Sequence, residues 1–190
     1  MRRAVPLLLV GLGLCLLIDG SWIHAKAALA QVMLEHAWLE TRGGESNVRP
    51  WPWADTWPVA RLDFPRLDAS MIVLSGASGR TLAFGPGHSR GTALPGEPGT
   101  AIVSGHRDTH FAVMRQLRRG DELRVETAAG RLVRYEIETL EIVDSRTVRL
   151  RAPHQGTALV LVTCWPFDAL TPGGPMRYVA TARSVTQDGR

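Results

Sequence analysis

Cys164 is the residue whose type and position could do covalent chemistry. It closes the apolar run Thr157-Ala-Leu-Val-Leu-Val-Thr-Cys164, and the other cysteine, Cys15, lies in the N-terminal hydrophobic segment and cannot reach it. An unpaired cysteine in a chain that enters an oxidising compartment is either an inert buried thiol or a nucleophile. A nucleophilic thiol needs a base or a positive environment, and acyl transfer also needs a proton donor and a group that stabilises the oxyanion.

Histidine and arginine are the natural partners for such a thiol, and the sequence places one of each at a strand end. His106 follows the apolar run 101–105, and Arg177 opens a strand-like run after Pro172-Gly-Gly-Pro-Met176. The rim of a barrel presents residues at strand ends, which makes these two the favoured partners of Cys164. Three other histidines lie in an N-terminal helical region or beside a proline in a loop: His24, His36 and His154.

A zinc site is the rival chemistry for the same residues. His106 and His110, four residues apart, could join Cys164 as three zinc ligands that leave a position open to water. That spacing aligns side chains on a helix, whereas residues 103–105 read as a strand that ends in a loop. The sequence therefore disfavours a metal site, and no compact acidic cluster predicts calcium.

A β-rich domain must position these residues. From Val59 onward, short aliphatic or β-branched runs alternate with glycine and proline turns, and residues 128–130 predict a hairpin turn. Many short strands of this kind favour a sandwich or a closed barrel. The predicted strands are Met71–Leu74, Thr100–Ser104, Glu122–Glu126, Leu132–Val143, Ala158–Thr163 and Met176–Ala182.

The N-terminus predicts export from the cytoplasm. Arg2 and Arg3 precede the uncharged run Val5–Ile18, which is the order of an export signal, and positive charge stays on the cytoplasmic side. The triplet 28–30 resembles a cleavage site but lies well beyond the apolar run, so we favour a retained anchor. We expect a single-pass protein of the cell membrane whose domain is extracytoplasmic, on the periplasmic side in a Gram-negative cell.

Three zones follow from this pattern. Residues 1–23 form the signal anchor, 24–58 a helical stalk with a Trp/Pro-rich linker, and 59–186 the β-domain. The stalk should present one apolar helix face and end before Gly43; its members are Leu29, Val32, Met33, Ala37 and Trp38. The tryptophans of segment 51–58 could anchor at a membrane interface or pack across the flank of the domain, and the sequence leaves both readings open.

The charge pattern excludes a nucleic-acid-binding function. The net charge is +4, and 21 of the 22 basic residues are arginines. They are interspersed with acidic neighbours, as in Arg118-Arg119-Gly-Asp121-Glu122, which is typical of a solvated surface rather than a basic stripe.

Several motifs together resemble one family. Leu161-Val-Thr-Cys164 resembles the end of the sortase nucleophile motif, Ser104-Gly-His106-Arg-Asp108 resembles the sortase histidine segment, and Arg177 matches the third member of that set. The resemblance covers residues 60–184. The segments 85–108 and 164–168 look most like the proteobacterial class GN sortases, although Val160 stands where the nucleophile motif has its first threonine.

The resemblance implies an all-β protein, a sortase-type eight-stranded β-barrel preceded by an N-terminal membrane-anchor helix. It also implies a cysteine transpeptidase that needs no cofactor and whose partners are a protein with a Leu-Pro-x-Thr-Gly-like C-terminal sorting signal and an amine acceptor. Cys164 would form a thioester, His106 would protonate the leaving amine, and Arg177 would stabilise the oxyanion. Secondary or substrate-binding residues would be Thr163, Asp108, Asp168 and His88. The alternative is a non-catalytic, membrane-tethered β-barrel that binds partner proteins.

Overall fold

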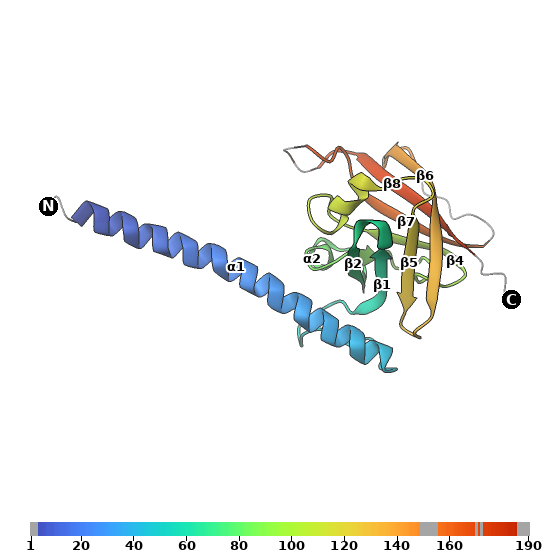
Figure 1. Cartoon of the computed structure of the whole chain (residues 1–190), viewed down its shortest axis with the longest axis horizontal. Coiled ribbons are helices and arrows are strands. Elements are labelled where there is room, and N and C mark those ends of the chain that lie inside the picture. The colour runs from blue at the N-terminus through green and yellow to red at the C-terminus, as the bar shows by residue number, and fades with distance from the viewer. Residues whose placement is uncertain (1–3, 149–155, 170, 172, 186–190) are drawn as a thin grey trace.

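The protein is a long helix followed by a β-barrel (Figure 1). A computed structural model describes residues 4–148, 156–169, 171 and 173–185. Its helical elements are α1 (Ala4–Arg42), α2 (Gly79–Leu82), η1 (Pro65–Leu67) and η2 (His110–Gln116). Its strands are β1 (Pro58–Phe64), β2 (Ala69–Ser75), β3 (Gly87–His88), β4 (Gly99–Ser104), β5 (Glu122–Thr127), β6 (Leu132–Asp144), β7 (Thr157–Cys164) and β8 (Met176–Ser184).

The eight strands close into a barrel in the order β1-β2-β3-β4-β7-β8-β6-β5. The β2–β3 and β4–β7 pairs are parallel, and the other pairs are antiparallel. Among the described residues every strand has a neighbour on both sides, although β3 pairs only two residues with each of its neighbours, and such closure limits edge-to-edge aggregation. The predicted closed barrel and six predicted strands are confirmed, with bounds that differ by one or two residues.

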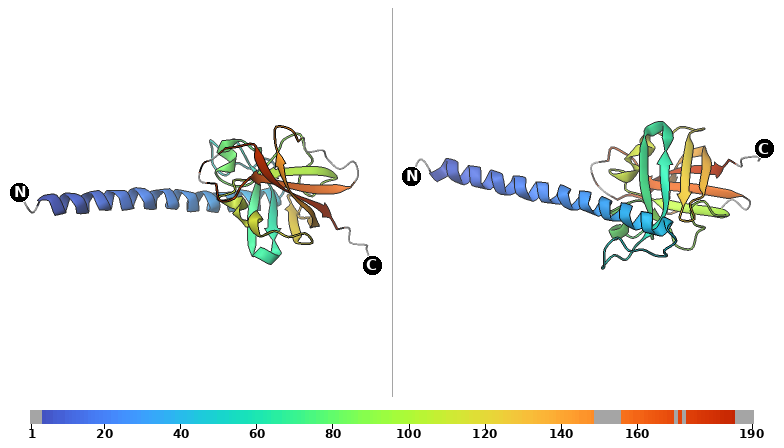
Figure 2. Two further views of the ribbon diagram at one scale, coloured as in Figure 1. Left: turned by 90° about the horizontal axis from the view of Figure 1, so that it is seen from above. Right: turned by 60° about the horizontal axis from the view of Figure 1, so that its bottom comes forward.

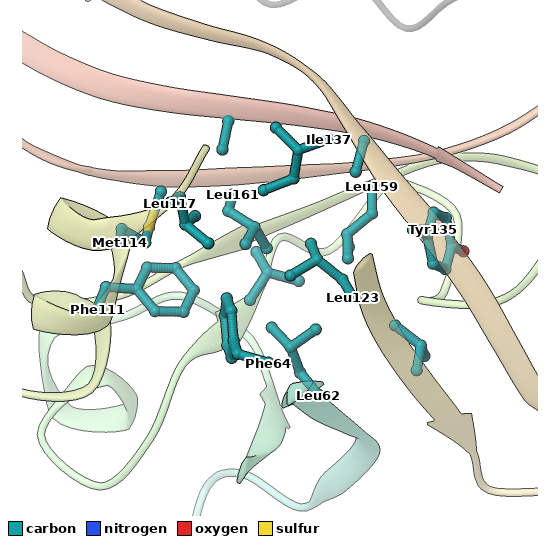
Figure 3. Packing of buried hydrophobic residues seen from close by; sticks show 14 of the residues in the cluster. Leu62, Phe64, Phe111, Met114, Leu117, Leu123, Tyr135, Ile137, Leu159 and Leu161 are labelled. Atoms are coloured by element: carbon teal, nitrogen blue, oxygen red, sulfur yellow. The ribbon is translucent and has the colours of Figure 1, made fainter. Parts of the chain in front are cut away.

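The barrel interior is filled by alternate residues of the strands (Figure 3). In β1 every second residue is buried and those between are half-buried, as expected where one face of a strand meets the core and the other is only partly covered. Phe111 and Met114 from η2 close one end of this core. The largest fully buried side chains of the cluster include Leu62, Phe64, Leu123, Tyr135, Ile137, Leu159 and Leu161.

The predicted hairpin at residues 128–130 is confirmed, and four short elements, η1, α2, β3 and η2, were not predicted. The amide of Thr127 donates to the carbonyl of Arg131, and Gly130 has φ 76°, a backbone conformation that glycine adopts without strain. The two-residue strand β3 was missed because residues 87–88 contain no aliphatic run. The short helix η2 was missed because its residues continue the loop that begins after the predicted strand.

Helix α1 packs its last three turns against the outside of β1 and β2 (Figure 2). Leu34 and Trp38 meet Ile72 and Leu74 in a second small core. Burial of each such large side chain contributes on the order of 1.5–3 kcal/mol. Arg42 adds an ion pair with Glu126 on β5, so the barrel holds the C-terminal part of the helix while the N-terminal part extends away from it.

The predicted apolar face of this helix was partly wrong. Ala37 and Trp38 are buried as expected, but Leu29 and Val32 are 59% and 65% exposed. At about 100° per residue, the nine residues from Leu29 to Trp38 place these side chains on opposite sides of the helix. The face that packs on the barrel consists of Ala30, Leu34, Ala37, Trp38 and Thr41.

Helix α1 is continuous through the boundary expected at residue 23, and it ends at Arg42, just before Gly43 as predicted. Within the described part of the chain, no helix has both the length and the apolar stretch that crossing a membrane requires. Arg2, Arg3 and His154 lie outside the described residues, as do the side chains of Cys15 and His24.

The tryptophans of the linker differ in whether they pack against the domain. Trp51 packs against Phe84, with ring centroids 4.7 Å apart, beside the small core under α1. The guanidinium of Arg90 lies 5.4 Å from the ring centroid of Trp57. Trp53 is 80% exposed. Packing across the flank of the domain therefore accounts for Trp51 and Trp57.

The ring of Phe111 lies so close to position 105, directly after β4, that only glycine fits there. A Cβ atom at this position would lie 2.7 Å from the ring of Phe111, a distance that real Cβ contacts essentially never show. Phe111 is fully buried in the core, so its ring has little room to retreat. The glycine lets η2 close the barrel end next to His106.

We predict that Gly105→Ala destabilises the domain by about 1–3 kcal/mol, because overpacking forces the Phe111 ring or the end of β4 to move. Urea unfolding of the full chain measures this difference. The matched control is Gly79→Ala in α2, where an added Cβ meets no atom within 4 Å. Equal stability of both variants would contradict the close-packing argument.

Candidate active site

Cys164 and Arg177 lie opposite each other on adjacent strands. They form the last matched pair of β7 and β8, which are antiparallel. Paired residues on such strands point to the same side, with Cβ atoms about 4.5–5.5 Å apart. Leu159 and Leu161 of β7 belong to the core, so strand alternation turns Cys164 to the outer face of the barrel. Thiol and guanidinium therefore share one outer face, and both residues are half-buried.

His106 reaches the same end of the barrel through the parallel pairing of β4 with β7. Ser104 pairs with Val162, and the amide of Gly105 donates to the Val162 carbonyl oxygen at 3.1 Å. His106 is the next residue and is exposed. Because both strands run in the same direction, two further residues bring His106 and Cys164 to the same level.

The hydroxyl of Thr163 strengthens this junction. Its Oγ1 is buried and donates to the carbonyl oxygen of Gly105 at 2.8 Å. The bond links the residue before Cys164 to the residue before His106. Thr163 therefore lies beside the two reactive groups as a structural link, with its side chain on the inner face.

The register thus places the backbones of His106, Cys164 and Arg177 at the same end of three neighbouring strands, β4, β7 and β8. A thiol, an imidazole and a guanidinium at one end of a barrel supply a nucleophile, a proton carrier and a fixed cation. This is the set that acyl transfer through a covalent intermediate requires.

Arg177 already makes two hydrogen bonds with one nitrogen. Its Nη1 donates to the carbonyl oxygens of Gly174 at 2.7 Å and Met176 at 2.9 Å. Within the described residues, Nε and Nη2 have no hydrogen-bond partner. The guanidinium is thus oriented by the loop before β8 and keeps donors for another ligand.

Two carboxylates, those of Asp108 and Asp168, were expected to support the site. Asp108 has a side chain that is 69% exposed, and its Oδ1 lies 3.3 Å from Nε of Arg107. Asp168 is exposed and lines a cavity of about 400 Å³ between the loop after β7 and η2; the other lining residues are Arg115, Trp165, Phe167 and Tyr178. Neither carboxylate has a hydrogen bond to His106 in the described structure.

His88 is a buried group with hydrogen bonds of its own. Its Nε2 lies 2.9 Å from the Ala93 carbonyl oxygen and 3.0 Å from Thr92 Oγ1. Burial lowers the pKa of His88, because the low-polarity surroundings disfavour the charged imidazolium, although hydrogen bonding to the backbone of Ala93 and Thr92 partly opposes the shift. The contacts of its Nε2 atom are with the loop 89–93. The expected contact of His88 with substrate remains a prediction.

His110 lies close enough to His106 for their charges to interact. Burial lowers the pKa of His110, and positive charge on His106 lowers it further. Among the described residues, no three His, Cys, Asp or Glu side chains are grouped so that they could hold a metal ion. His106, His110 and Cys164 are therefore not assembled as the zinc ligands of the rival interpretation.

Arg107 is a buried residue beside the candidate site that the sequence analysis did not single out. It stands between His106 and Asp108, yet its side chain is only 5% exposed. Its guanidinium donates to main-chain carbonyl oxygens of the loop after Cys164. The only signal in the sequence is its place in the segment 104–108, since burial of an arginine cannot be read from a local pattern.

A comparison with family models identifies one match. The model described as the sortase domain matches residues 62–185, which is most of the barrel. Sortase D of Bacillus subtilis (strain 168) is 34% identical over 126 residues, which are 66% of this chain and 63% of that protein. The chain thus spans about 63% of the length of this curated relative.

Solved structures show the same fold. Sortase A from Corynebacterium diphtheriae has a TM-score of 0.63 at 25% identity, over 72% of this chain and 64% of that one. A Clostridium perfringens sortase D5 transpeptidase has a TM-score of 0.67 at 21% identity, over 84% of this chain and 99% of that one. The second likeness, at its low identity, shows the fold alone.

The buried His88 predicts a loss of stability in mild acid. Its pKa lies below the ordinary value of 6.5 in the folded chain, so the unfolded chain binds more protons once the pH falls through about 6.5. We predict that the thermal unfolding midpoint falls between pH 7 and pH 5. The variant His88→Gln, whose amide can donate to the same carbonyl but does not titrate, should fall less.

His110→Gln is the matched comparison, because the pKa of His110 is also lowered. The double variant should show the smallest difference between pH 7 and pH 5. Scanning calorimetry at both pH values measures these differences. A His88→Gln chain with the same pH dependence as the wild type would contradict the assignment.

Proposed function

The chain belongs to the sortase family, whose members are cysteine transpeptidases that act on peptide bonds, and we propose that this chain is itself such an enzyme. The observation that carries the proposal is the strand register. The parallel pairing of β4 with β7 and the antiparallel pairing of β7 with β8 bring His106, Cys164 and Arg177 to one end of the barrel.

In the first half-reaction, the thiolate Sγ of Cys164 attacks the carbonyl carbon of the scissile peptide bond. Arg177 uses the donors left free by its loop contacts to hold the oxyanion and the substrate backbone. The C–N bond then breaks, His106 gives a proton to the departing amine, and the N-terminal part of the substrate remains on sulfur as a thioester.

In the second half-reaction, an acceptor amine attacks the thioester carbon. The neutral imidazole of His106 takes a proton from the amine, a new amide bond forms, and Cys164 leaves as the thiolate. Water in place of the amine gives a free carboxylate and thus hydrolysis. Because His106 is exposed at the rim, both nucleophiles have access to it.

We propose that the substrate is a protein with a Leu-Pro-x-Thr-Gly-like C-terminal sorting signal, cleaved after the threonine. The finer assignment to the class GN subgroup rests on residues 85–108 and on Cys164-Trp-Pro-Phe-Asp168. A non-catalytic barrel that binds partner proteins is the alternative, and it would make no use of the thiol.

The acyl-enzyme gives the direct test. Full chain in detergent micelles, mixed with a Leu-Pro-x-Thr-Gly peptide library, should gain the mass of the N-terminal peptide fragment, and Cys164→Ala should gain none. Arg177→Gln should form the adduct about 10²–10³-fold more slowly, as expected when one oxyanion donor is removed. Intact mass spectrometry follows the adduct and identifies the preferred motif.

Arg183→Gln is the control, because Arg183 lies on the same face of β8 but pairs with Glu138 far from Cys164. Its rate should match the wild type. No adduct on a thiol that also resists alkylation would favour the binding-module alternative. An adduct on the Cys164→Ala chain would refute the nucleophile assignment.

We also propose that the N-terminal part of α1 is a retained membrane anchor, with the barrel on the extracytoplasmic side. The support is the order of charge and apolar residues in segment 2–18 and the free extension of the helix from the barrel. An anchor would hold the enzyme at the surface to which the hydrophobic tail of its substrate is bound.

We predict that the full chain stays in the membrane pellet after washing at alkaline pH, because an inserted helix resists removal of peripheral proteins. Deletion of residues 4–23 should release the protein, and these residues make no described contact with the barrel. Immunoblots of pellet and supernatant measure the distribution. A full chain found in the washed supernatant, or one with its N-terminus removed, would refute the retained anchor.

A further inference from the structure

We propose that Arg107 is a positioning residue for the transfer reaction: its buried guanidinium ties the segment that follows Cys164 to the segment that carries His106, and so sets the placement of thiol and imidazole. The inference rests on the proposed function and extends it to a residue that touches neither substrate nor reacting atoms.

The side chain of Arg107 joins two loops by hydrogen bonds. Nη1 donates to the carbonyl oxygen of Pro166 at 2.6 Å, and Nη2 donates to those of Ala169 at 2.7 Å and Thr171 at 3.4 Å. All three acceptors belong to the connection between β7 and β8. Pro166 is two residues after Cys164, and Arg107 is one residue after His106, so the guanidinium bridges the backbone next to both.

The burial of this side chain shows how firmly it is held. Arg107 is 6% exposed, and a buried charge is tolerated only where hydrogen bonds replace its water. The neighbouring Asp108 lies 3.3 Å from Nε, but its own side chain is 69% exposed. Main-chain carbonyl oxygens therefore supply most of the compensation, and the guanidinium loses these bonds if the loop moves away.

The chemistry of the contact requires arginine. Hydrogen bonds toward several fixed carbonyl oxygens need a planar group whose N–H bonds diverge in one plane. The ammonium of lysine is a compact point charge and cannot reach Pro166 and Ala169 with the same spacing. A lysine variant would keep the charge and lose the geometry, which separates the two contributions.

In the described part of the chain, few other hydrogen bonds join these two segments. The last ones before it are the hydrogen bonds of Gly105 with Val162 and Thr163, both on the strand side of the reactive groups. Arg107 adds the link on the loop side. Hydrogen bonds therefore join the two segments both before and after the pair His106 and Cys164, and they fix the relative position of these two residues although both lie at the rim.

Arg115 provides a matched comparison. It also donates to the loop after Cys164, through Nη2 to the Phe167 carbonyl oxygen at 2.9 Å, and its guanidinium lies 5.4 Å from the Phe167 ring centroid. It is exposed, comes from η2, and makes one described hydrogen bond to the loop instead of three. Loss of Arg115 should therefore loosen the loop much less.

The test compares Arg107→Met, Arg107→Lys and Arg115→Met in the full chain, with kcat and KM measured on the peptide that acylates the wild type. Arg107→Met should lower kcat about 10- to 100-fold, in line with the cost of misplacing reacting groups by about 1 Å, while KM changes less than about threefold. Arg107→Lys should recover little of the loss, and Arg115→Met should stay within about threefold of the wild type.

Hydrogen–deuterium exchange supplies a readout that does not depend on turnover. Exchange of the backbone amides that follow Cys164 should rise in Arg107→Met and stay near the wild-type level in Arg115→Met. Unchanged kcat in Arg107→Met, full recovery in Arg107→Lys, or equal losses in Arg107→Met and Arg115→Met would each overturn the proposal. A wild type that forms no acyl-enzyme with any peptide would instead refute the proposed function, and exchange would still decide whether Arg107 holds the loop.

Discussion

The parallel pairing of β4 with β7 is the constraint on which the rest of the structure depends. Six matched pairs, from Gly99 with Thr157 to Ser104 with Val162, join segments that lie more than fifty residues apart. A parallel pair cannot be closed by a tight turn, because the chain must return to the same end of the sheet. Here η2, β5 and β6 make that return, and they also complete the barrel wall. A one-residue slip would turn Cys164 inward and separate its level from that of His106.

The reactive residues occupy the outer face and the end of the strands, where core packing places few demands on side-chain type. Inside the same strands, Leu159, Leu161, Val103 and Ala180 fill the core. Because side chains alternate along a strand, the inward residues of each strand stabilise the core and the outward residues are available for the reaction. The separation is incomplete at the strand ends, where the buried side chains of Thr163 and Arg107 make hydrogen bonds beside the half-buried Cys164 and the exposed His106.

The sequence was informative where local pattern determines structure. Runs of β-branched residues located most strands, and Cys164, His106 and Arg177 stood out because each ends or begins such a run. It was less informative where distant residues decide the outcome. Leu29 and Val32 looked like core residues, but the face of α1 that meets β1 and β2 was selected by Leu34 and Trp38. Burial of Arg107 likewise depends on carbonyl oxygens some sixty residues away, which no local pattern reveals.

The barrel order also explains why a long helix can pack on this domain without covering its reactive end. In the closed order, β1 and β7 are four strands apart, so they lie on opposite walls. Helix α1 lies outside β1 and β2, and the outer face that carries Cys164 and Arg177 is formed by β7 and β8. A chain tethered through α1 therefore keeps the β7–β8 wall free of the tether. Because the helix is fixed to the barrel by Leu34, Trp38 and the Arg42–Glu126 ion pair, its direction also fixes the orientation of that wall relative to whatever holds the N-terminus.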